Sequence, residues 1–450
     1  MSAIARYFKA AGKIVCGYDK TATALTNSLQ QEGINVTYDD EISTLPQFLS
    51  GTGVNPEALV IYTPAIPKNH LQYNHLVTLG YRMWKRSQVL GLITENTYTL
   101  AVAGTHGKTT TSTMIAHIMK FNNVDCTAFL GGISKNYQTN LLLPQTTEGS
   151  GVVIVEADEF DRSFLTLFPD IAVITSLDAD HLDIYGNREA MVASYSQFAS
   201  QVKNTGKLIC KWGLQLIGNP PPSITYSIDQ PSTYRAFNVR VENHNYVFDL
   251  DGKGTTHTNF ILTWPGRHNV ENATAAIAVC YSYGIPMEGI RKALETFSGV
   301  NRRFDYQVRT PQIIYIDDYA HHPEELRAAI LSVKELYPGK KILGVFQPHL
   351  FTRTRDFADG FGESLSNLDE LILLDIYPAR ELPIPGVTSQ LIAEKVTIMN
   401  KQICPRNQVV DSVLMSDAEV ILTLGAGDID ELVPDIKISL ENKFLKQSVK

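Results

Sequence analysis

Short apolar runs alternate with amphipathic segments along most of this chain, which is the pattern of strands alternating with helices. The first 88 residues begin with an amphipathic helical segment that ends at Gly12. After it, strands are expected at Lys13–Gly17, Ile34–Tyr38 and Ala58–Tyr62, with helices around Leu25–Gln31 and from His70. Because helices that connect parallel strands cover the sheet they join, this order predicts a parallel, helix-covered sheet.

The same alternation continues toward the C-terminus. Between residues 89 and 299, strands are expected at Tyr98–Ala103, Gly151–Val155 and Asp170–Thr175, with helices from Lys108 and over Val270–Tyr283. Residues 205–263 are β-rich and polar, and Asp251-Gly252 is typical of a hairpin turn. In the last block, strands followed by helices are expected at Ile313–Ile316, Lys341–Phe346, Leu371–Leu374 and Val420–Leu424. The predicted fold class is therefore α/β.

Composition narrows the class of protein further. At about 100–200 residues per domain, the 450 residues correspond to several domains, with three the central expectation. The net charge of −8 argues against a protein whose main task is to coat nucleic acid or an anionic membrane. We expect neither a signal peptide nor a membrane span. Five scattered cysteines without C-x-x-C spacing indicate a reducing, cytoplasmic compartment and no zinc–cysteine site.

One segment carries the strongest chemical signal, and it lies between an apolar strand and a helix: Gly104-Thr105-His106-Gly107-Lys108-Thr109-Thr110. In that position, glycines let backbone N–H groups approach a phosphate, and the helix N-terminus adds partial positive charge. Lys108 is suited to the outer phosphates of a nucleotide, and the Thr109 hydroxyl to Mg²⁺. The strict P-loop spacing requires glycine where this chain has Val102, so the segment is a shortened variant.

Two acidic clusters follow strands of the same block. Glu156-Ala157-Asp158-Glu159 ends one apolar strand, and Asp178-Ala179-Asp180-His181 follows the next. Ligands in open α/β sheets bind at this edge, so Glu156 is a candidate for Mg²⁺ and His181 for a second cation or a phosphate. The alternatives are a helix N-cap for the first cluster and a structural role for His181.

Polar residues also gather at the strand ends of the last block. They lie in Asp317-Asp318-Tyr319-Ala320-His321-His322-Pro323, Gln347-Pro348-His349 and Gly425-Ala426-Gly427-Asp428, with Arg353 and Arg355 shortly after His349. Arg302 and Arg303 stand at the join between the second and third blocks, where arginines can clamp a phosphate or a carboxylate. The alternative is that part of this set forms surface ion pairs.

Six motifs occur in an order that resembles the Mur ligases, the ATP-dependent amide-bond-forming enzymes of peptidoglycan assembly. They are Gly104–Thr110, Glu156–Glu159, Asp178–His181, His268-Asn269-Val270-Glu271-Asn272-Ala273, Arg302-Arg303-Phe304-Asp305 and Asp317–Pro323. The resemblance spans nearly the whole chain. Tyr319–Pro323, Gln347–His349 and Thr352–Asp356 resemble the member that adds the first amino acid, L-alanine.

The resemblance implies a Rossmann-like UDP-sugar-binding domain at 1–88, a P-loop ATPase-like domain at 89–299 and a Rossmann-like amino-acid-binding domain at 300–450. It implies a cytoplasmic ligase that uses ATP and Mg²⁺ to join L-alanine to the lactyl carboxylate of UDP-N-acetylmuramate. The carboxylate would attack the γ-phosphate, and the amine of alanine would displace phosphate from the acyl phosphate. Because acyl phosphates hydrolyse in water, the third domain is expected to close over ATP. Neither nucleic acid nor membrane is an expected partner, and a monomer or homodimer is expected.

The resemblance also assigns site residues by their positions in the motifs. The ATP-binding set is Gly104, Thr105, Gly107, Lys108, Thr109, Thr110, His268, Asn269, Asn272, Arg303 and Asp317. The metal set is Thr109, Glu156 and His181, and the catalytic set is Lys108, Glu156, His181 and His321. The substrate set is Asp19, His106, Asp158, Ser163, His321, His349, Arg353 and Arg355.

The Mur ligases open with a strand and a glycine-rich turn, G-x-G-G-x-G-M-S, and this chain begins with Met1-Ser2, where that motif ends. We therefore expect the natural start to lie upstream. Two alternatives to the alanine ligase stay open: a recycling ligase that attaches a whole tripeptide to the same UDP-sugar, and a nucleotide-binding module without catalysis. A folate-type polyglutamate ligase shares the ATP domain, but the first block gives no reason to prefer it.

Overall fold

The computed structural model describes residues 1–145, 151–178, 185–218, 220, 223–379 and 381–444. The chain divides into two compact units, unit 1 with Met1–Arg235 and Asn272–Ala293, and unit 2 with Ala236–Glu271 and Leu294–Lys450. Strands alternate with helices in both, which confirms the predicted α/β class. The domain boundaries expected after residues 88 and 299 stay a prediction. Within the described ranges, no helix combines the length and the apolar character needed to cross a membrane.

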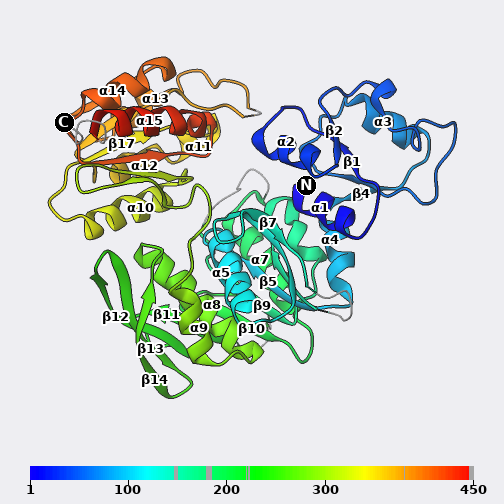
Figure 1. The fold of residues 1–450 in the computed structure, drawn as a ribbon, viewed down its shortest axis with the longest axis horizontal. Coiled ribbons are helices and arrows are strands. Elements are labelled where there is room, and N and C mark those ends of the chain that lie inside the picture. Colours follow the sequence, from blue (N-terminus) through cyan, green and yellow to red (C-terminus); the bar gives the residue numbers. More distant parts are fainter. Residues whose placement is uncertain (146–150, 179–184, 219, 221–222, 380, 445–450) are drawn as a thin grey trace. The chain divides into compact units, whose positions relative to one another are not determined.

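A mostly parallel sheet forms the centre of unit 1 (Figure 1). Its strands are β5 Tyr98–Ala103, β6 Cys126–Ser134, β7 Thr139–Leu142, β8 Val152–Glu156, β9 Ile171–Ile174, β10 Lys207–Lys211 and β11 Ser223–Ile228. They run in the order β11-β10-β9-β5-β8-β6-β7, and the pairings are parallel except that of β6 with β7. The accompanying helices are α5 Lys108–Phe121, η2 Phe160–Thr166, α7 Arg188–Ser200, α8 Arg267–Tyr283 and α9 Met287–Leu294. The carboxyl ends of β8, β5 and β9 therefore lie side by side.

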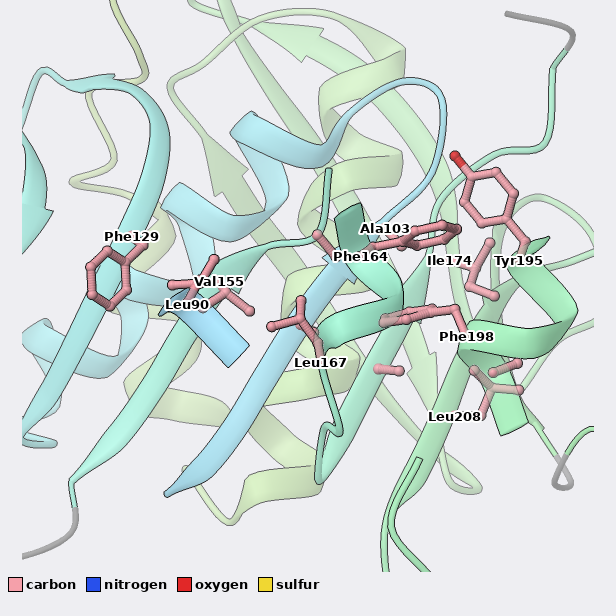
Figure 2. Close-up of a cluster of buried hydrophobic side chains, with 14 of the residues drawn as sticks. Leu90, Ala103, Phe129, Val155, Phe164, Leu167, Ile174, Tyr195, Phe198 and Leu208 are labelled. Carbon is pink, nitrogen blue, oxygen red and sulfur yellow. The ribbon is translucent and has the colours of Figure 1, made fainter. Parts of the chain in front are cut away.

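One face of this sheet packs against a cluster of large apolar side chains (Figure 2). The Phe164 ring lies 5.1 Å from the rings of both Tyr195 and Phe198, so η2 and α7 are held together over the sheet. Leu167 and Ile174 are buried in the same cluster. Each such side chain contributes about 1.5–3 kcal/mol by burial. This packing fixes η2, and with it the acidic segment that connects β8 to η2.

The N-terminal part of unit 1 contains two parallel strand pairs, β1 with β2 and β3 with β4. Its elements are α1 Ser2–Ala10, β1 Cys16–Tyr18, α2 Ala24–Gln31, β2 Asn35–Thr37, η1 Ile42–Thr44, β3 Val60–Tyr62, α3 Leu71–Thr78, β4 Met83–Lys85 and α4 Arg86–Glu95. Arg6 on α1 pairs with Glu32 at 2.6 Å and donates to Asn140 Oδ1 at 2.8 Å. These contacts tie α1 both to the end of α2 and to β7.

Unit 2 contains an antiparallel ribbon and a second, mainly parallel sheet (Figure 1). The ribbon strands are β12 Tyr234–Glu242, which begins in unit 1, β13 Asn245–Gly252 and β14 Thr255–Leu262. The sheet runs in the order β15-β16-β20-β17-β18-β19, with β15 Asp305–Arg309, β16 Ile314–Asp318, β17 Ile342–Phe346, β18 Glu370–Leu373, β19 Lys401–Ile403 and β20 Val420–Leu424. Only β15 pairs antiparallel among these described strands.

Helices cover both faces of the second sheet (Figure 1). They are α10 Pro323–Leu336, α11 Phe351–Asp356, α12 Ala358–Leu365, α13 Ser389–Ala393, η3 Arg406–Gln408, α14 Val409–Met415, η4 Asp428–Leu432 and α15 Val433–Phe444. The side chains of β17 alternate between the faces. Leu343 and Val345 join the core beneath α14 and α15, whereas the Phe346 ring lies 5.5 Å from Phe361 of α12.

The hairpin turn between β13 and β14 lies two residues later than the sequence predicted. Asp251 and Gly252 pair with Thr256 and Thr255 inside the ladder. The turn consists of Lys253 and Gly254, which have φ values of 49° and 82°. A two-residue turn of type I′ needs positive φ at both positions, and glycine meets that need most easily. The prediction at Asp251-Gly252 was wrong because Lys253-Gly254, two positions further on, meets the same backbone requirement.

Candidate active site

The predicted phosphate loop forms the turn between β5 and α5. Helix α5 begins at Lys108, and Gly107, with φ of 78°, is its N-cap. A Cβ atom on Gly104 would lie 1.9 Å from Thr175 Oγ1, so the loop needs a glycine where it passes the end of β9. The backbone N–H of His106 donates to Ser176 Oγ at 2.8 Å. The loop is thus held against the neighbouring strand, with the positive end of a helix dipole at its exit.

The ammonium group of Lys108 lies among oxygen atoms of the protein. Its Nζ donates to Gly104 O at 2.7 Å and Thr105 O at 3.3 Å, and lies 2.9 and 2.8 Å from Oε1 and Oε2 of Glu159. The side chains of Lys108 and Glu159 are 13% and 2% exposed. Burial acts to lower the pKa of Lys108, but the nearby carboxylates, with Glu159 foremost, raise it above its ordinary value. Lys108 is therefore charged at neutral pH.

Glu156, the last residue of β8, has its carboxylate over Gly131 of the neighbouring strand β6. A Cβ atom on Gly131 would lie 2.1 Å from Glu156 Oε2, so the carboxylate occupies space that only a glycine leaves open. Oε2 is buried and has no hydrogen-bond partner in the described part of the protein. A buried carboxylate oxygen in that state suits a hard divalent cation such as Mg²⁺.

The rest of the predicted metal set is less complete. His181 lies outside the described residues. Thr109 is in the first turn of α5, next to Lys108. Among the residues that the structure describes, no three His, Cys, Asp or Glu side chains are grouped so that they could hold a metal ion by themselves. The fit to a cation therefore rests on Glu156.

Asn272 of α8 lies beside the phosphate loop. A Cβ atom on Gly107 would lie 2.4 Å from Asn272 Oδ1, and Thr111 Oγ1 donates to the same oxygen at 3.3 Å. Thr110 is buried in the first turn of α5. His268 and Asn269, which precede Asn272 in the same motif and are also in the predicted ATP-binding set, belong to unit 2. There, Asn269 Nδ2 donates to Pro265 O at 2.5 Å.

The four members of the predicted substrate set that belong to unit 1 lie in separate local environments. Asp19 is exposed and accepts from Thr21 N at 3.2 Å, and His106 Nε2 lies 3.8 Å from Asp178 Oδ2. Asp158 pairs with Arg86 of α4 at 3.3 Å. Ser163 lies in η2, and its backbone carbonyl accepts from Thr166 Oγ1 at 2.9 Å. Their roles toward a substrate stay predictions.

In unit 2, three of the four members of the predicted substrate set, His321, His349 and Arg353, lie together. His321 Nδ1 is 2.9 Å from Tyr319 O and 3.3 Å from Glu325 Oε2. The His321 ring centroid lies 6.0 Å from that of His349, and Arg353 Nη1 lies 3.5 Å from His349 Nδ1. Burial lowers the pKa of His321 to about 4, so its imidazole is neutral at neutral pH.

Two features of this cluster differ from the sequence prediction. Arg355 is half-exposed and pairs with its neighbour Asp356 at 2.7 Å, so the structure does not bring it into the cluster. Sequence reasoning missed Glu325, which accepts from the backbone N–H groups of His321 at 3.0 Å and His322 at 3.3 Å. The signal was present, because an acidic residue three positions after a helix N-cap is typical of a capping box.

Arg303 and Asp317, both members of the predicted ATP-binding set, do not pair with each other. Asp317 is 1% exposed, accepts from Thr423 Oγ1 at 2.7 Å, and has Arg302 Nε 3.4 Å from its Oδ2. Burial raises the pKa of Asp317 to about 6, although Arg302 favours the carboxylate. Arg303 Nη1 instead lies 3.7 Å from Glu325 Oε1. The sequence named both Arg302 and Arg303 as candidate clamps, but it did not show that Arg302 is the one that lies beside Asp317.

The burial of His268 leads us to expect that the stability of the folded protein depends on pH. Burial, assisted by Arg303, lowers its pKa from 6.5 to about 4. The unfolded chain therefore binds a proton first, and stability is lost as the pH falls from about 6.5 toward 4. Asp317 acts in the opposite direction over the same range, because its pKa is raised on folding. We expect His268→Gln to show a smaller drop in thermal midpoint between pH 7 and pH 5 than the unaltered protein shows.

The control for this prediction is His257→Gln, a substitution on the antiparallel ribbon strand β14. It removes one imidazole and is expected to leave the pH dependence unchanged. Calorimetry of the three proteins at both pH values measures the difference. If His268→Gln retained the full pH dependence, a neutral buried imidazole at this position would be ruled out.

Two domains of one family match this chain: the Mur ligase middle domain over residues 102–280, and the Mur ligase glutamate ligase domain over residues 302–427. The chain belongs to the Mur ligase family and is an ATP-dependent ligase that forms amide bonds. The UDP-N-acetylmuramate–L-alanine ligase of Flavobacterium johnsoniae is 49% identical to it over 99% of this chain and 96% of the relative.

Solved structures agree with this assignment. The crystal structure of the UDP-N-acetylmuramate–alanine ligase MurC from Thermotoga maritima superposes on this chain with a TM-score of 0.82 and 26% sequence identity. The match covers 100% of this chain and 97% of the Thermotoga chain. A murein peptide ligase from Psychrobacter arcticus has the same fold, with a TM-score of 0.70 and 21% identity. That match covers 98% of this chain and 96% of the Psychrobacter chain. The resemblance predicted from the six motifs is thereby confirmed.

Proposed function

We propose that this chain joins L-alanine to the lactyl carboxylate of UDP-N-acetylmuramate while ATP is converted to ADP and phosphate. The observation that carries the proposal is the 49% identity, over almost the full length of both chains, to a relative named for that reaction. The P-loop with a charged, buried Lys108 supplies the matching chemistry. The tripeptide-adding alternative is less favoured, because the murein peptide ligase is the more distant structural relative.

A carboxylate does not react with an amine until one of its oxygens becomes a leaving group. In the proposed reaction, a carboxylate oxygen bonds to the γ-phosphorus of ATP, the bond from that phosphorus to the bridging oxygen breaks, and ADP leaves. The amine nitrogen of alanine then bonds to the carbonyl carbon. The carbon–oxygen bond breaks, and phosphate leaves with the oxygen that came from the carboxylate. Lys108 and the N-terminus of α5 offset the repulsion between the phosphates and the approaching carboxylate.

We propose that Mg²⁺ takes part, held by Thr109, Glu156 and His181. The buried, unpartnered Oε2 of Glu156 over Gly131 supports this proposal. When bound there, Mg²⁺ would supply positive charge to the phosphate oxygens. Gly104, Thr105, Gly107 and Thr110 are proposed to surround those phosphates, Asn272 to lie beside them, and His268, Asn269, Arg303 and Asp317 to contact the rest of the nucleotide.

The cluster around His321 is proposed to hold the amino acid. Arg353, only 9% exposed, is suited to the carboxylate of alanine. The Nδ1 atom of His321 faces Tyr319 O at 2.9 Å, and that contact requires the proton on Nδ1. The other nitrogen, Nε2, is then an acceptor, and we propose that it takes the proton which the amine loses. His349 would fix the orientation of Arg353.

The remaining assignments belong to the same proposal. Residues 1–88 would bind the UDP-sugar, 89–299 the ATP and 300–450 the amino acid. Asp19, His106, Asp158 and Ser163 are proposed to contact the sugar substrate. We propose that the enzyme works in the cytoplasm, where these nucleotides occur, as a monomer or homodimer.

An amino-acid screen tests the substrate assignment. Phosphate release is measured with ATP, Mg²⁺ and UDP-N-acetylmuramate, together with L-alanine, glycine, L-serine or the tripeptide L-alanyl-γ-D-glutamyl-meso-diaminopimelate. We expect the highest kcat/KM with L-alanine, and a value lower by about tenfold or more with glycine, which lacks one methyl group. Release with the tripeptide above that with alanine would instead identify a recycling ligase. Release that never exceeds the ATP-only blank would identify an inert nucleotide-binding module.

A further inference from the structure

Glu159 contacts Lys108 of the phosphate loop, but it has no role in the proposed mechanism. It is the last residue of the acidic cluster Glu156–Glu159, and its side chain is 2% exposed. Both carboxylate oxygens lie within 3 Å of one atom, Lys108 Nζ, at 2.9 and 2.8 Å. A buried carboxylate is costly unless it is paired, so the ion pair with this ammonium group stabilises the buried Glu159.

The surroundings hold Glu159 in that position. The hydroxyl of Tyr185, itself 5% exposed, donates to the Glu159 backbone carbonyl at 2.6 Å. Asp161 and Arg162, two and three positions after Glu159, both have left-handed backbone conformations, with φ of 53° and 54°. The Arg162 N–H also donates to the Glu159 carbonyl, at 3.0 Å. A backbone fixed in this way directs the carboxylate at the loop and keeps it there.

The three hydrogen atoms of the Lys108 ammonium group therefore have acceptors within the protein. Two are carbonyl oxygens of the loop, Gly104 O and Thr105 O, and the third is the carboxylate of Glu159. Only the last of these carries charge. The outer phosphates of ATP must engage the same ammonium group if Lys108 acts as proposed, and they carry more negative charge than a carboxylate.

We propose that Glu159 is a positioning residue that occupies the phosphate's place on Lys108, and that binding of ATP exchanges the Glu159 carboxylate for the β- and γ-phosphates. The inference rests on the proposed role of the loop in binding ATP. It has two consequences. Glu159 keeps the ammonium group at the mouth of the loop when no nucleotide is bound, and it competes with the nucleotide for that group. Affinity for ATP is thus set below the value that the loop alone would give.

The test compares Glu159→Gln with Glu159→Asp. Glutamine keeps the shape and one acceptor oxygen but removes the competing charge, whereas aspartate keeps the charge on a shorter side chain. Binding of the non-hydrolysable analogue β,γ-imido-ATP is measured by calorimetry at constant ionic strength. We expect the Kd to fall about tenfold with glutamine, which corresponds to about 1.4 kcal/mol. With aspartate, the Kd should stay within about twofold of the unaltered protein.

Glu57→Gln is the matched control, because it makes the same change in net charge at an exposed position of the N-terminal part. It should not alter the Kd. Thermal unfolding of each variant verifies that it is folded. A Kd that is unchanged or raised in folded Glu159→Gln would overturn the proposal and leave the pair with a purely structural role. If the unaltered protein does not bind β,γ-imido-ATP at all, the proposed ATP site itself fails, which is a distinguishable result.

Discussion

Replacing Lys108 by alanine is expected to abolish ligase turnover, with kcat lowered about a thousandfold at saturating substrates. The side chain supplies a full positive charge, and its exposed fraction is only 13%, so little water can substitute for it. The loss should appear in kcat because charge builds up on the transferring phosphoryl group in the transition state. Phosphate release and amide formation, followed in parallel, measure the effect. Substantial turnover in the folded variant would remove Lys108 from the catalytic assignment.

Because Lys108 is paired with the buried Glu159, the Lys108→Ala variant needs a control for unfolding. Alanine at position 108 removes the ammonium group that faces the buried Glu159 carboxylate, and losing one member of a buried ion pair costs about 3–5 kcal/mol. Part of any loss of activity could then come from unfolding. The double variant Lys108→Ala/Glu159→Gln removes both charges, so we expect it to recover much of the thermal midpoint. It should remain inactive.

Glu156→Ala is the second change with a large expected effect. If Glu156 holds Mg²⁺, its removal should lower turnover at a fixed Mg²⁺ concentration by about 100-fold, and added Mg²⁺ should restore part of the loss. Binding of Mn²⁺ in the presence of ADP, followed by electron paramagnetic resonance, gives a readout that does not depend on catalysis. Unchanged Mn²⁺ binding would contradict the metal assignment.

Gly131→Ala offers a graded form of the same test. The added Cβ would lie 2.1–2.6 Å from the carboxylate atoms of Glu156, so the carboxylate must move while its charge is kept. We expect an intermediate effect on Mn²⁺ binding, about tenfold. Gly17→Ala is the control for a glycine in a strand, because a Cβ there meets no atom within 4 Å. It should leave Mn²⁺ binding unchanged.

The phosphate loop could be predicted from the sequence because its determinants are local. The apolar strand, the glycines and the helix start at Lys108 lie within a short stretch, and each leaves its own pattern. Glu159 is different, because it stands 51 positions away from Lys108. The two meet only because β5 and β8 are neighbours in the sheet. The sequence placed acidic residues at strand ends, but it did not show which strands are adjacent.

The cluster around His321 illustrates the same limit. His321, His349 and Arg353 were predicted from motifs and lie together, whereas Arg355 of the same motif turns to its neighbour Asp356. Arg353 and Arg355 are two positions apart in α11, and residues two positions apart on a helix do not share a face. Patterns indicate which residue types are present, whereas packing decides which of them face the site.

An isotope experiment tests the central claim, that ATP transfers its γ-phosphoryl group to the sugar carboxylate in the P-loop site. UDP-N-acetylmuramate labelled with ¹⁸O in the lactyl carboxylate is incubated with the enzyme, ATP, Mg²⁺ and L-alanine, and the released phosphate is analysed by mass spectrometry. The account predicts one ¹⁸O atom in each phosphate and ADP as the nucleotide product. Unlabelled phosphate, or AMP with pyrophosphate, would contradict it.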